Sequence, residues 1–208
     1  DIVGNDNHLL IWAAIVVAFF FLLRGGEYLC HDGASYDGAK VVRGCDITFY
    51  NEAKPVNVGR QAEEVNLHLR SAKADIFNAG TTRNHFRSGT DLCPVAVLAE
   101  VQRRFPERFG HGEEAGKPLF RKADGDPILR SEVQSLVQAA AAEFGEDSGR
   151  FATHSLRIGG ASALLHAGFS IEMIQRWGRW ASRARGFPAD VPWGVVWPGV
   201  GARRGGGG

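Results

Sequence analysis

Two residues in the segment 153–160 have side chains and a spacing suited to binding an anion. His154 and Arg157 lie three residues apart, so on a helix they project from one face toward a shared ligand. The forked guanidinium matches the oxygens of a phosphate, and an imidazole can transfer a proton near neutral pH. The spacing indicates a phosphate site, with Arg24 as a second arginine from far upstream. A solvated basic pair at a helix start is the alternative.

The composition is that of an ordinary globular protein of 208 residues, 44% hydrophobic and 23% charged. Its 24 lysines and arginines nearly balance 23 acidic residues, so any contact with nucleic acid must come from local basic clusters. The three cysteines are far apart and lack the C-x-x-C spacing, which argues against a disulfide framework and a zinc site. We therefore expect an intracellular protein, nuclear if eukaryotic, without a metal.

An apolar run at 9–23 ends directly before Arg24. It is shorter than the roughly eighteen residues that a membrane-spanning helix needs, and no second run follows. We expect a buried core helix from about His8 to about Cys30 and no membrane partner, with a membrane segment as the alternative. An unpaired buried guanidinium is costly, so Arg24 needs either an acidic neighbour such as Glu27 or an anion to bind.

A small sheet is predicted in the middle of the chain. Residues 45–50 and 65–70 have the pattern of half-buried strands, and a third strand begins near Gly80. The turn that follows the second strand carries Lys73. We expect one antiparallel three-stranded sheet with Lys73 at its edge.

Four helices are predicted after the sheet, from residues typical of helix starts and ends. These are, in order, Pro94 and Pro106; Ser131 with Gln134, and Gly145; Thr153 and Gly168; and Ser170, followed by inward-facing Ile171, Ile174 and Trp177. The fold class is therefore α+β and mainly helical, in one domain over 1–183. Glycine and proline dominate 184–208, where we expect an irregular, disordered tail.

Several motifs resemble those of the tyrosine recombinases, the phage integrase family. The second conserved box of that family is similar to His154-Ser155-Leu156-Arg157 with Gly160 and Gly178-Arg179-Trp180, and the first box to residues 22–29. Details similar to the branch encoded by eukaryotic retrotransposons and cryptons are the turn at Lys73, Cys93-Pro94 and Phe120 with Gly125 and Pro127. The resemblance covers 12–182, most of a catalytic domain, and implies a protein of DNA recombination and integration from a mobile element.

The resemblance implies a role for five residues in breaking and rejoining double-stranded DNA. Arg24 and Arg157 would hold the non-bridging oxygens of the scissile phosphate and stabilise the charge that builds on them. Lys73 would protonate the leaving 5′ oxygen, His154 would act as general acid or base, and Trp180 would pack on the phosphate. Such enzymes conserve the bond energy in a 3′-phosphotyrosine and need no metal or small-molecule cofactor. The family works as a homo-oligomer on DNA.

The sequence departs from the family pattern at the nucleophile. A tyrosine should lie about nine residues after Trp180, where Pro188-Ala189-Asp190 stand instead. The sequence contains tyrosine only at Tyr28, Tyr36 and Tyr50. The predicted function is therefore a recombinase domain that is inactive alone, or else a non-catalytic DNA-binding remnant of a mobile element. One hypothesis for the loss is that the tail is translated from a shifted reading frame.

Other basic residues leave alternatives open. Lys54 or Arg70 could take the role given to Lys73. Arginines 103, 104, 108, 179, 183 and 185 could contact backbone phosphates or could be ordinary solvated residues. The remaining histidines share no spacing, and we expect them to be surface or incidental residues: His8, His31, His68, His85, His111 and His166.

Overall fold

The computed structural model describes residues 4–70 and 80–180. In chain order the elements are α1 (Asp6–Phe20), α2 (Gly25–Tyr28), β1 (Ile47–Asn51), β2 (Lys54–Val56), β3 (Glu64–Leu69), β4 (Thr81–Phe86), α3 (Pro94–Arg104), α4 (Arg130–Glu143), α5 (Thr153–His166) and α6 (Ile171–Gly178). This confirms a mixed helical and antiparallel-sheet fold with helices before and after the sheet. Lys73 and the predicted tail lie outside the described residues.

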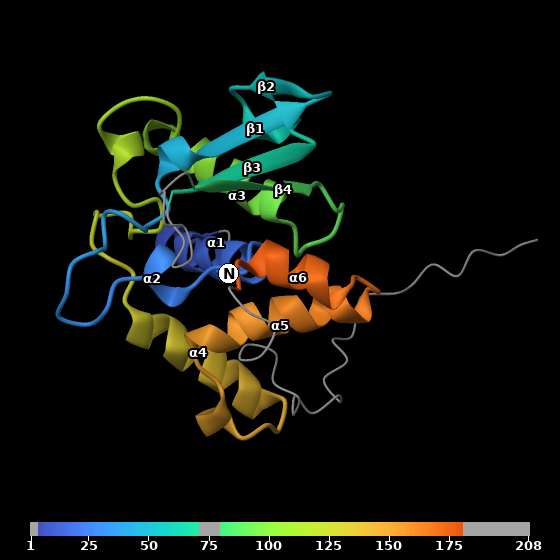
Figure 1. Cartoon of the computed structure of the whole chain (residues 1–208). Helices are drawn as coiled ribbons and strands as arrows, with labels where there is room; N and C mark the ends of the chain where they lie inside the picture. Colours follow the sequence, from blue (N-terminus) through green and yellow to red (C-terminus); the bar gives the residue numbers. More distant parts are fainter. Residues whose placement is uncertain (1–3, 71–79, 181–208) are drawn as a thin grey trace, which may run out of the picture.

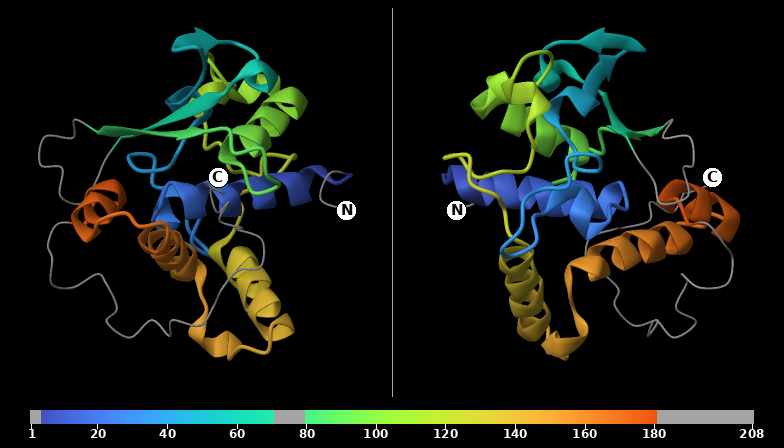
Figure 2. Two further views of the ribbon diagram at one scale, coloured as in Figure 1. Left: turned by 90° about the vertical axis from the view of Figure 1, so that its right-hand side faces the viewer. Right: turned by 60° about the vertical axis from the view of Figure 1, so that its left-hand side comes forward.

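Helix α1 lies at the centre of the fold. In Figures 1 and 2 it lies between the sheet with α3 on one side and α4 with α5 on the other. Both α3 and α5 pack directly on it, which is why its side chains are buried on nearly all faces. Within 4–70 and 80–180, no helix combines the length and apolar composition that crossing a membrane requires.

The first helix is shorter than the sequence suggested. It begins at the cap residue Asn5, whose Oδ1 accepts from the N–H of His8 at 3.1 Å, and it ends at Phe20 rather than near Cys30. The chain breaks because Leu22 adopts a left-handed conformation with φ 50°, which no continuous helix allows. The prediction of one helix to Cys30 was wrong, and the break brings the Leu22 carbonyl into the candidate site described below.

The sheet has four strands in the order β2-β1-β3-β4, all antiparallel, rather than the three predicted. The additional strand β2 follows a two-residue turn in which Glu52 and Ala53 have φ of 48° and 61°. Such turns usually carry Asn-Gly, and because Glu52-Ala53 stands here instead, this hairpin was not predicted. Pro55 is tolerated because β2 is an edge strand.

The four helices after the sheet are confirmed, with two differences in detail. Helix α4 begins at Arg130 rather than Ser131, because the Glu132 carboxylate accepts from the N–H of Leu129 at 2.8 Å, and the Ser131 hydroxyl bonds Asp32 instead. In α6, Ile174 is fully buried but Ile171 is 47% exposed, so the prediction of an inward Ile171 was wrong.

Gly160 permits the close packing of α5 on the end of α1. A Cβ at this position would lie 2.2 Å from the carbonyl oxygen of Phe19, whereas one at Gly159 would meet only the Phe19 ring at 3.3 Å. We expect Gly160→Ala to lower the free energy of unfolding by about 1–3 kcal/mol through overpacking. Gly159→Ala should change it by less than about 1 kcal/mol. Urea denaturation of both variants measures this, and equal effects would contradict the close contact.

Candidate functional site

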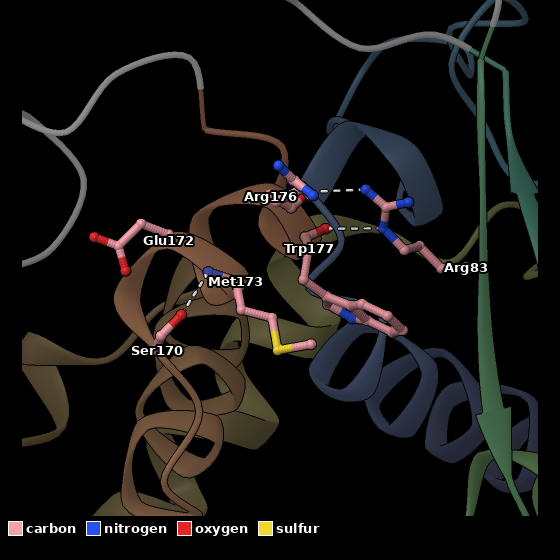
Figure 3. Close-up of a pocket in the computed structure, with 6 residues that line it drawn as sticks. All are labelled: Arg83, Ser170, Glu172, Met173, Arg176 and Trp177. Carbon is pink, nitrogen blue, oxygen red and sulfur yellow. Dashed lines mark hydrogen bonds between the residues drawn. The ribbon is translucent and has the colours of Figure 1, made fainter.

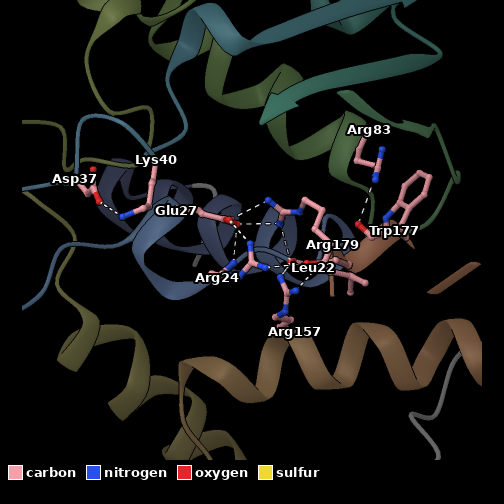
Figure 4. Close-up of polar contacts among 10 residues, drawn as sticks. Leu22, Arg24, Glu27, Asp37, Lys40, Arg83, Arg157, Trp177 and Arg179 are labelled. Carbon is pink, nitrogen blue, oxygen red and sulfur yellow. Dashed lines mark hydrogen bonds and ion pairs between the residues drawn. The ribbon is translucent and has the colours of Figure 1, made fainter. Parts of the chain in front are cut away.

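Three arginines from distant parts of the chain meet where α1 ends and α5 and α6 pack together. We call Arg24, Arg157 and Arg179 the arginine cluster (Figure 4). Arg24 precedes the first residue of α2, Arg157 lies in the second turn of α5, and Arg179 ends α6. Their guanidinium groups converge because the left-handed Leu22 turns the chain back toward α5 and α6.

Arg157 is the most deeply buried member of the cluster, at 2% exposure. Its Nη1 donates to the carbonyl of Leu22 and its Nη2 to the carbonyl of Gly178. Its guanidinium also stacks on the Trp180 ring, 4.2 Å from the ring centre. Burial, with the charges of Arg24 and Arg179, lowers the pKa of Arg157 to about 9, so it remains a cation at neutral pH.

Gly178 explains how Trp180 reaches this position. A Cβ on residue 178 would lie 1.7 Å from the Trp180 ring, so a glycine is needed for the indole to fold back over Arg157. The Gly178 carbonyl then accepts from Arg157 beneath that ring. In the motif Gly178-Arg179-Trp180, the glycine therefore makes room for the indole of Trp180, which packs over Arg157.

Within residues 4–70 and 80–180, one carboxylate, that of Glu27, pairs with members of the arginine cluster. Glu27 is 3% exposed and pairs with Arg179 through two bonds, Nη1 to Oε1 at 2.9 Å and Nη2 to Oε2 at 3.0 Å. It also accepts from Arg24, at 2.8 Å from the backbone N–H and 3.2 Å from Nη1. Three cations around one anion leave two uncompensated positive charges, an arrangement that favours binding of a further anion.

The outermost member, Arg24, has the most exposed side chain of the three. Its side chain is 34% exposed, whereas those of Glu27 and Arg179 are nearly inaccessible. Its Nη2 donates to the carbonyl of Arg179 at 3.0 Å, which ties the start of α2 to the end of α6. An anion approaching from solvent would meet Arg24 first.

His154 lies exposed on α5, one turn before Arg157. Partial burial, together with the charges of Arg157 and Arg130, lowers the pKa of His154. The folded protein therefore binds this proton less tightly than the unfolded chain does. The contribution of neutral His154 to the free energy of unfolding is fully present above about pH 6.5, the pKa in the unfolded chain. It is lost as the pH falls through the lower pKa that His154 has in the folded protein.

An NMR titration of the His154 ring tests whether Arg157 and Arg130 lower its pKa, with the His154 signal identified by its loss in His154→Gln. We expect a midpoint below about 6.5, the value for an unstructured histidine. A bound oligonucleotide should raise the midpoint, because phosphate charge opposes that of the arginines. A midpoint at or above that of a short unfolded peptide carrying the same histidine would contradict the assignment.

Contacts between β4 and α6, which we call the β4–α6 seam, hold the end of α6 in place. Arg83 donates to the carbonyls of Arg176 at 2.8 Å and Trp177 at 3.4 Å, and His85 donates from Nε2 to the carbonyl of Phe20 at 2.8 Å. The His85 ring packs against Trp177, so of the two alternatives left open for this histidine, surface or incidental, the surface one was wrong. Burial lowers the pKa of His85, consistent with a neutral ring.

A shallow pocket of about 520 Å³ opens beside this seam (Figure 3). Arg176 and Arg83 flank it, and Met173 and Trp177 supply its apolar wall. The Arg83 guanidinium is engaged with backbone carbonyls and with Thr81 Oγ1, so its hydrogen-bonding capacity is largely used by the fold. We therefore attribute the pocket to the packing of α6 against β4 and assign it no ligand.

The predicted site residues are partly brought together. Arg24, Arg157 and Trp180 meet in one cluster, and His154 lies beside it. Arg179 was not among the predicted catalytic residues, although it lies inside the motif Gly178-Arg179-Trp180. Its left-handed backbone, with φ 60°, turns the side chain inward, and nothing in the helical pattern indicates that turn.

Four of the other basic residues left open by the sequence, arginines 70, 103, 104 and 108, have structural partners, whereas Arg183 and Arg185 lie outside the described residues. Arg70 pairs with Asp46, its Nη2 lying 2.6 Å from Oδ1, and Arg103 pairs with Glu100 at 2.6 Å. Arg108 is 2% exposed and donates to the carbonyls of Arg121 and Lys122, so the expectation of a solvated or phosphate-contacting Arg108 was wrong. Its burial places it in the core, beneath the Phe105 ring.

Two of the three tyrosines are poorly suited to act as nucleophiles. Tyr28 is fully buried, and burial raises its pKa. The Tyr36 hydroxyl donates to the carbonyl of Phe120 at 2.6 Å and accepts from the N–H of Ile128, and burial raises its pKa to about 12. Tyr50 lies on β1, an inner strand of the sheet, where it is paired with Pro55 of β2 on one side and Glu64 of β3 on the other.

No group of three histidine, cysteine, aspartate or glutamate side chains in the described parts of the chain could hold a metal ion. The arginine cluster offers a ligand positive charge and N–H donors. A guanidinium donates hydrogen bonds and cannot ligate a metal, which makes an anion the fitting ligand.

No protein-family model and no curated protein matches the chain. Among solved structures, it is similar to the Tn1549 transposon integrase in complex with circular intermediate DNA, with 14% sequence identity and a TM-score of 0.40. The match covers 86% of this chain and 52% of that chain, so this chain spans about half the length of the integrase structure. A likeness this distant decides nothing about the activity of this chain.

Proposed function

We propose that this chain is a DNA-binding domain of the tyrosine recombinase type, in which the arginine cluster binds a phosphodiester of double-stranded DNA. The observation that carries the proposal is the meeting of three arginines in one place: Arg24 and Arg179 share the carboxylate of Glu27, and Arg157 and Arg179 share the carbonyl of Leu22. Forked guanidinium groups match the oxygens of a phosphate, and the two excess charges suit an anion.

The cluster also fits the charge changes of phosphodiester cleavage. Negative charge builds on the non-bridging oxygens in the transition state, and rigid cations held by backbone carbonyls stabilise it without rearrangement. Arg157 is held in this way by Leu22 and Gly178. His154, beside the cluster, is the candidate for proton transfer, and Lys73 remains the candidate proton donor to the leaving oxygen.

Cleavage by this polypeptide alone is not part of the proposal. No tyrosine follows Tyr50 in the sequence, and burial raises the pKa of both Tyr28 and Tyr36, which disfavours a nucleophilic phenolate. This observation favours the second candidate function, a DNA-binding remnant that keeps the phosphate pocket without the nucleophile. The two candidates differ in whether a supplied tyrosine restores strand cleavage.

Covalent trapping on a nicked suicide DNA substrate tests the proposal. We expect the chain to shift the DNA in a native gel but to leave no protein on the DNA after denaturation. A second version, with the segment after Trp180 replaced by a tyrosine-bearing helix, should form the covalent link if it is a recombinase domain. A covalent adduct with the present sequence, or no DNA binding at low salt, would overturn the proposal.

The finer parts of the proposal rest on the sequence motifs. They are the relation to retrotransposon- and crypton-encoded recombinases, the origin in a mobile element, nuclear localisation and assembly into a homo-oligomer on DNA. Sedimentation of the chain with a duplex oligonucleotide would test the last of these, since an oligomer on DNA sediments faster than a one-to-one complex.

A further inference from the structure

We propose that Arg179 is a third phosphate-binding residue of the arginine cluster, held ready for the ligand by Glu27. This inference rests on the proposed function and adds Arg179 to it. The sequence left Arg179 open between a backbone-phosphate contact and ordinary solvation, and its burial excludes the second. It is carried by the backbone conformation of Arg179, the bonds of its side chain and the charge around it.

The backbone of Arg179 is unusual for an arginine. It ends α6 in the left-handed conformation, with φ 60° and ψ 40°, where glycine or asparagine is the common choice. A long side chain in this conformation is retained against a steric cost when the direction it gives that side chain matters. Here the side chain is directed back into the cluster, with 9% of the residue exposed.

The hydrogen bonds of Arg179 within residues 4–70 and 80–180 leave its Nε atom without a partner. Both Nη atoms bind the Glu27 carboxylate, and Nη2 also donates to the carbonyl of Leu22 at 3.2 Å. Its Nε is buried and has no partner among the residues that the structure describes. A buried N–H without an acceptor is unfavourable, and an oxygen of a bound phosphate would satisfy it.

Charge distinguishes Arg179 from an ordinary structural ion pair. Glu27 already has a cationic partner in Arg24, with Nη1 3.2 Å from Oε1, so one carboxylate serves two paired arginines. Arg157 adds a third cation within the same buried region. A structural pair needs one cation for one anion, whereas this excess suits a site whose second anion is the ligand.

Arg108 provides the comparison for a purely structural arginine. It too is buried, and its Nε also makes no hydrogen bond in the described part of the chain. Arg108, however, has a carboxylate of its own, with Nε 3.9 Å from Glu107 Oε1, and its neighbour Arg121 has Glu114 at 2.6 Å. An Nε without a hydrogen bond is therefore not enough to indicate a ligand site. At Arg179 the additional observation is that two arginines share one carboxylate, that of Glu27.

The salt dependence of binding to a duplex oligonucleotide tests the inference. A residue that neutralises a phosphate contributes about one to the slope of log Kobs against log salt concentration. We expect Arg179→Gln to reduce that slope by about one and to weaken binding roughly ten-fold at low salt. Arg108→Gln, which removes an equally buried guanidinium, should leave the slope unchanged. Circular dichroism and thermal melting establish which variants are folded.

A measurement on the unaltered chain keeps the inference testable if Arg179→Gln does not fold. The Nε–H signal of Arg179 in a ¹H–¹⁵N spectrum, assigned with Arg179→Lys, should shift downfield when duplex DNA binds, because a phosphate oxygen becomes its acceptor. An unmoved signal in the presence of bound DNA, or an unchanged slope in folded Arg179→Gln, would overturn the inference.

The outcomes separate this inference from the proposed function. If the unaltered chain does not bind DNA, the proposed function fails and the role of Arg179 fails with it. If the chain binds DNA and Arg24→Gln reduces the slope while Arg179→Gln does not, the proposed function stands and only the role of Arg179 is wrong.

Discussion

Replacing Arg157 with alanine is expected to lower the free energy of unfolding by about 2–4 kcal/mol. The change leaves the buried carbonyl of Gly178 without its donor and opens a cavity beneath the Trp180 ring. Leu22 keeps a second donor in Arg179 Nη2, at 3.2 Å, so only one carbonyl loses its partner. Relief of repulsion among the arginines offsets part of the cost, and chemical denaturation followed by tryptophan fluorescence measures the net effect.

The matched control for Arg157 is Arg103 on α3, whose side chain is 43% exposed and bonds Glu100. Arg103→Ala should cost less than about 1 kcal/mol, as is usual for a surface ion pair. Arg157→Lys should weaken DNA binding more than Arg103→Lys, because an ammonium group keeps the charge but cannot replace the fork. Equal losses of stability and of binding at the two positions would show that Arg157 has no special role.

Replacing Glu27 with glutamine is the second large change, expected to cost about 3–5 kcal/mol because it removes the one counter-charge of a buried cation cluster. The amide is nearly isosteric, so the loss would come from charge rather than shape. Inorganic phosphate at constant ionic strength should then stabilise Glu27→Gln more than it stabilises the unaltered chain, since a bound anion takes over the role of the carboxylate. Thermal melting across a phosphate series measures both effects.

Glu100→Gln is the control for Glu27. Glu100 pairs with three arginines, Arg60, Arg103 and Arg104, but its side chain is 25% exposed and solvent screens the pairing. Hydrogen bonds and charge from Arg103 and Arg104 lower the pKa of Glu100 to about 2, so it too is ionised at neutral pH. We expect no phosphate-dependent recovery in Glu100→Gln. Recovery of equal size in both variants would mean that phosphate acts on the protein in general.

The sequence was informative about the site where a motif and local structure agree. Arg24 and Arg157 were predicted as partners, and Glu27 was expected as a neighbour of Arg24 because a buried guanidinium needs a counter-charge. The bonds from Arg24 to Glu27 confirm that expectation. Helices α5 and α6 were also predicted, since Thr153, Gly168 and Ser170 are typical of helix ends.

The remaining features depend on backbone conformations that no periodic pattern encodes. Leu22, Glu52 and Ala53 are ordinary residues with positive φ, and they end α1 and form the β1–β2 turn without a glycine or asparagine. Arg179 is another, and its inward side chain was invisible for the same reason. The burial of His85 follows from the meeting of β4 with α6, a contact between segments far apart in the sequence.

The most direct test of the phosphate-binding role is the salt dependence of DNA binding by Arg24→Gln. Arg24 is the accessible member of the arginine cluster, so its loss should leave the fold intact, as thermal melting would establish. We expect the slope of log Kobs against log salt concentration to become shallower by about one, and binding to weaken roughly ten-fold, while Arg103→Gln matches the unaltered chain. Identical slopes for Arg24→Gln, Arg103→Gln and the unaltered chain would contradict the account.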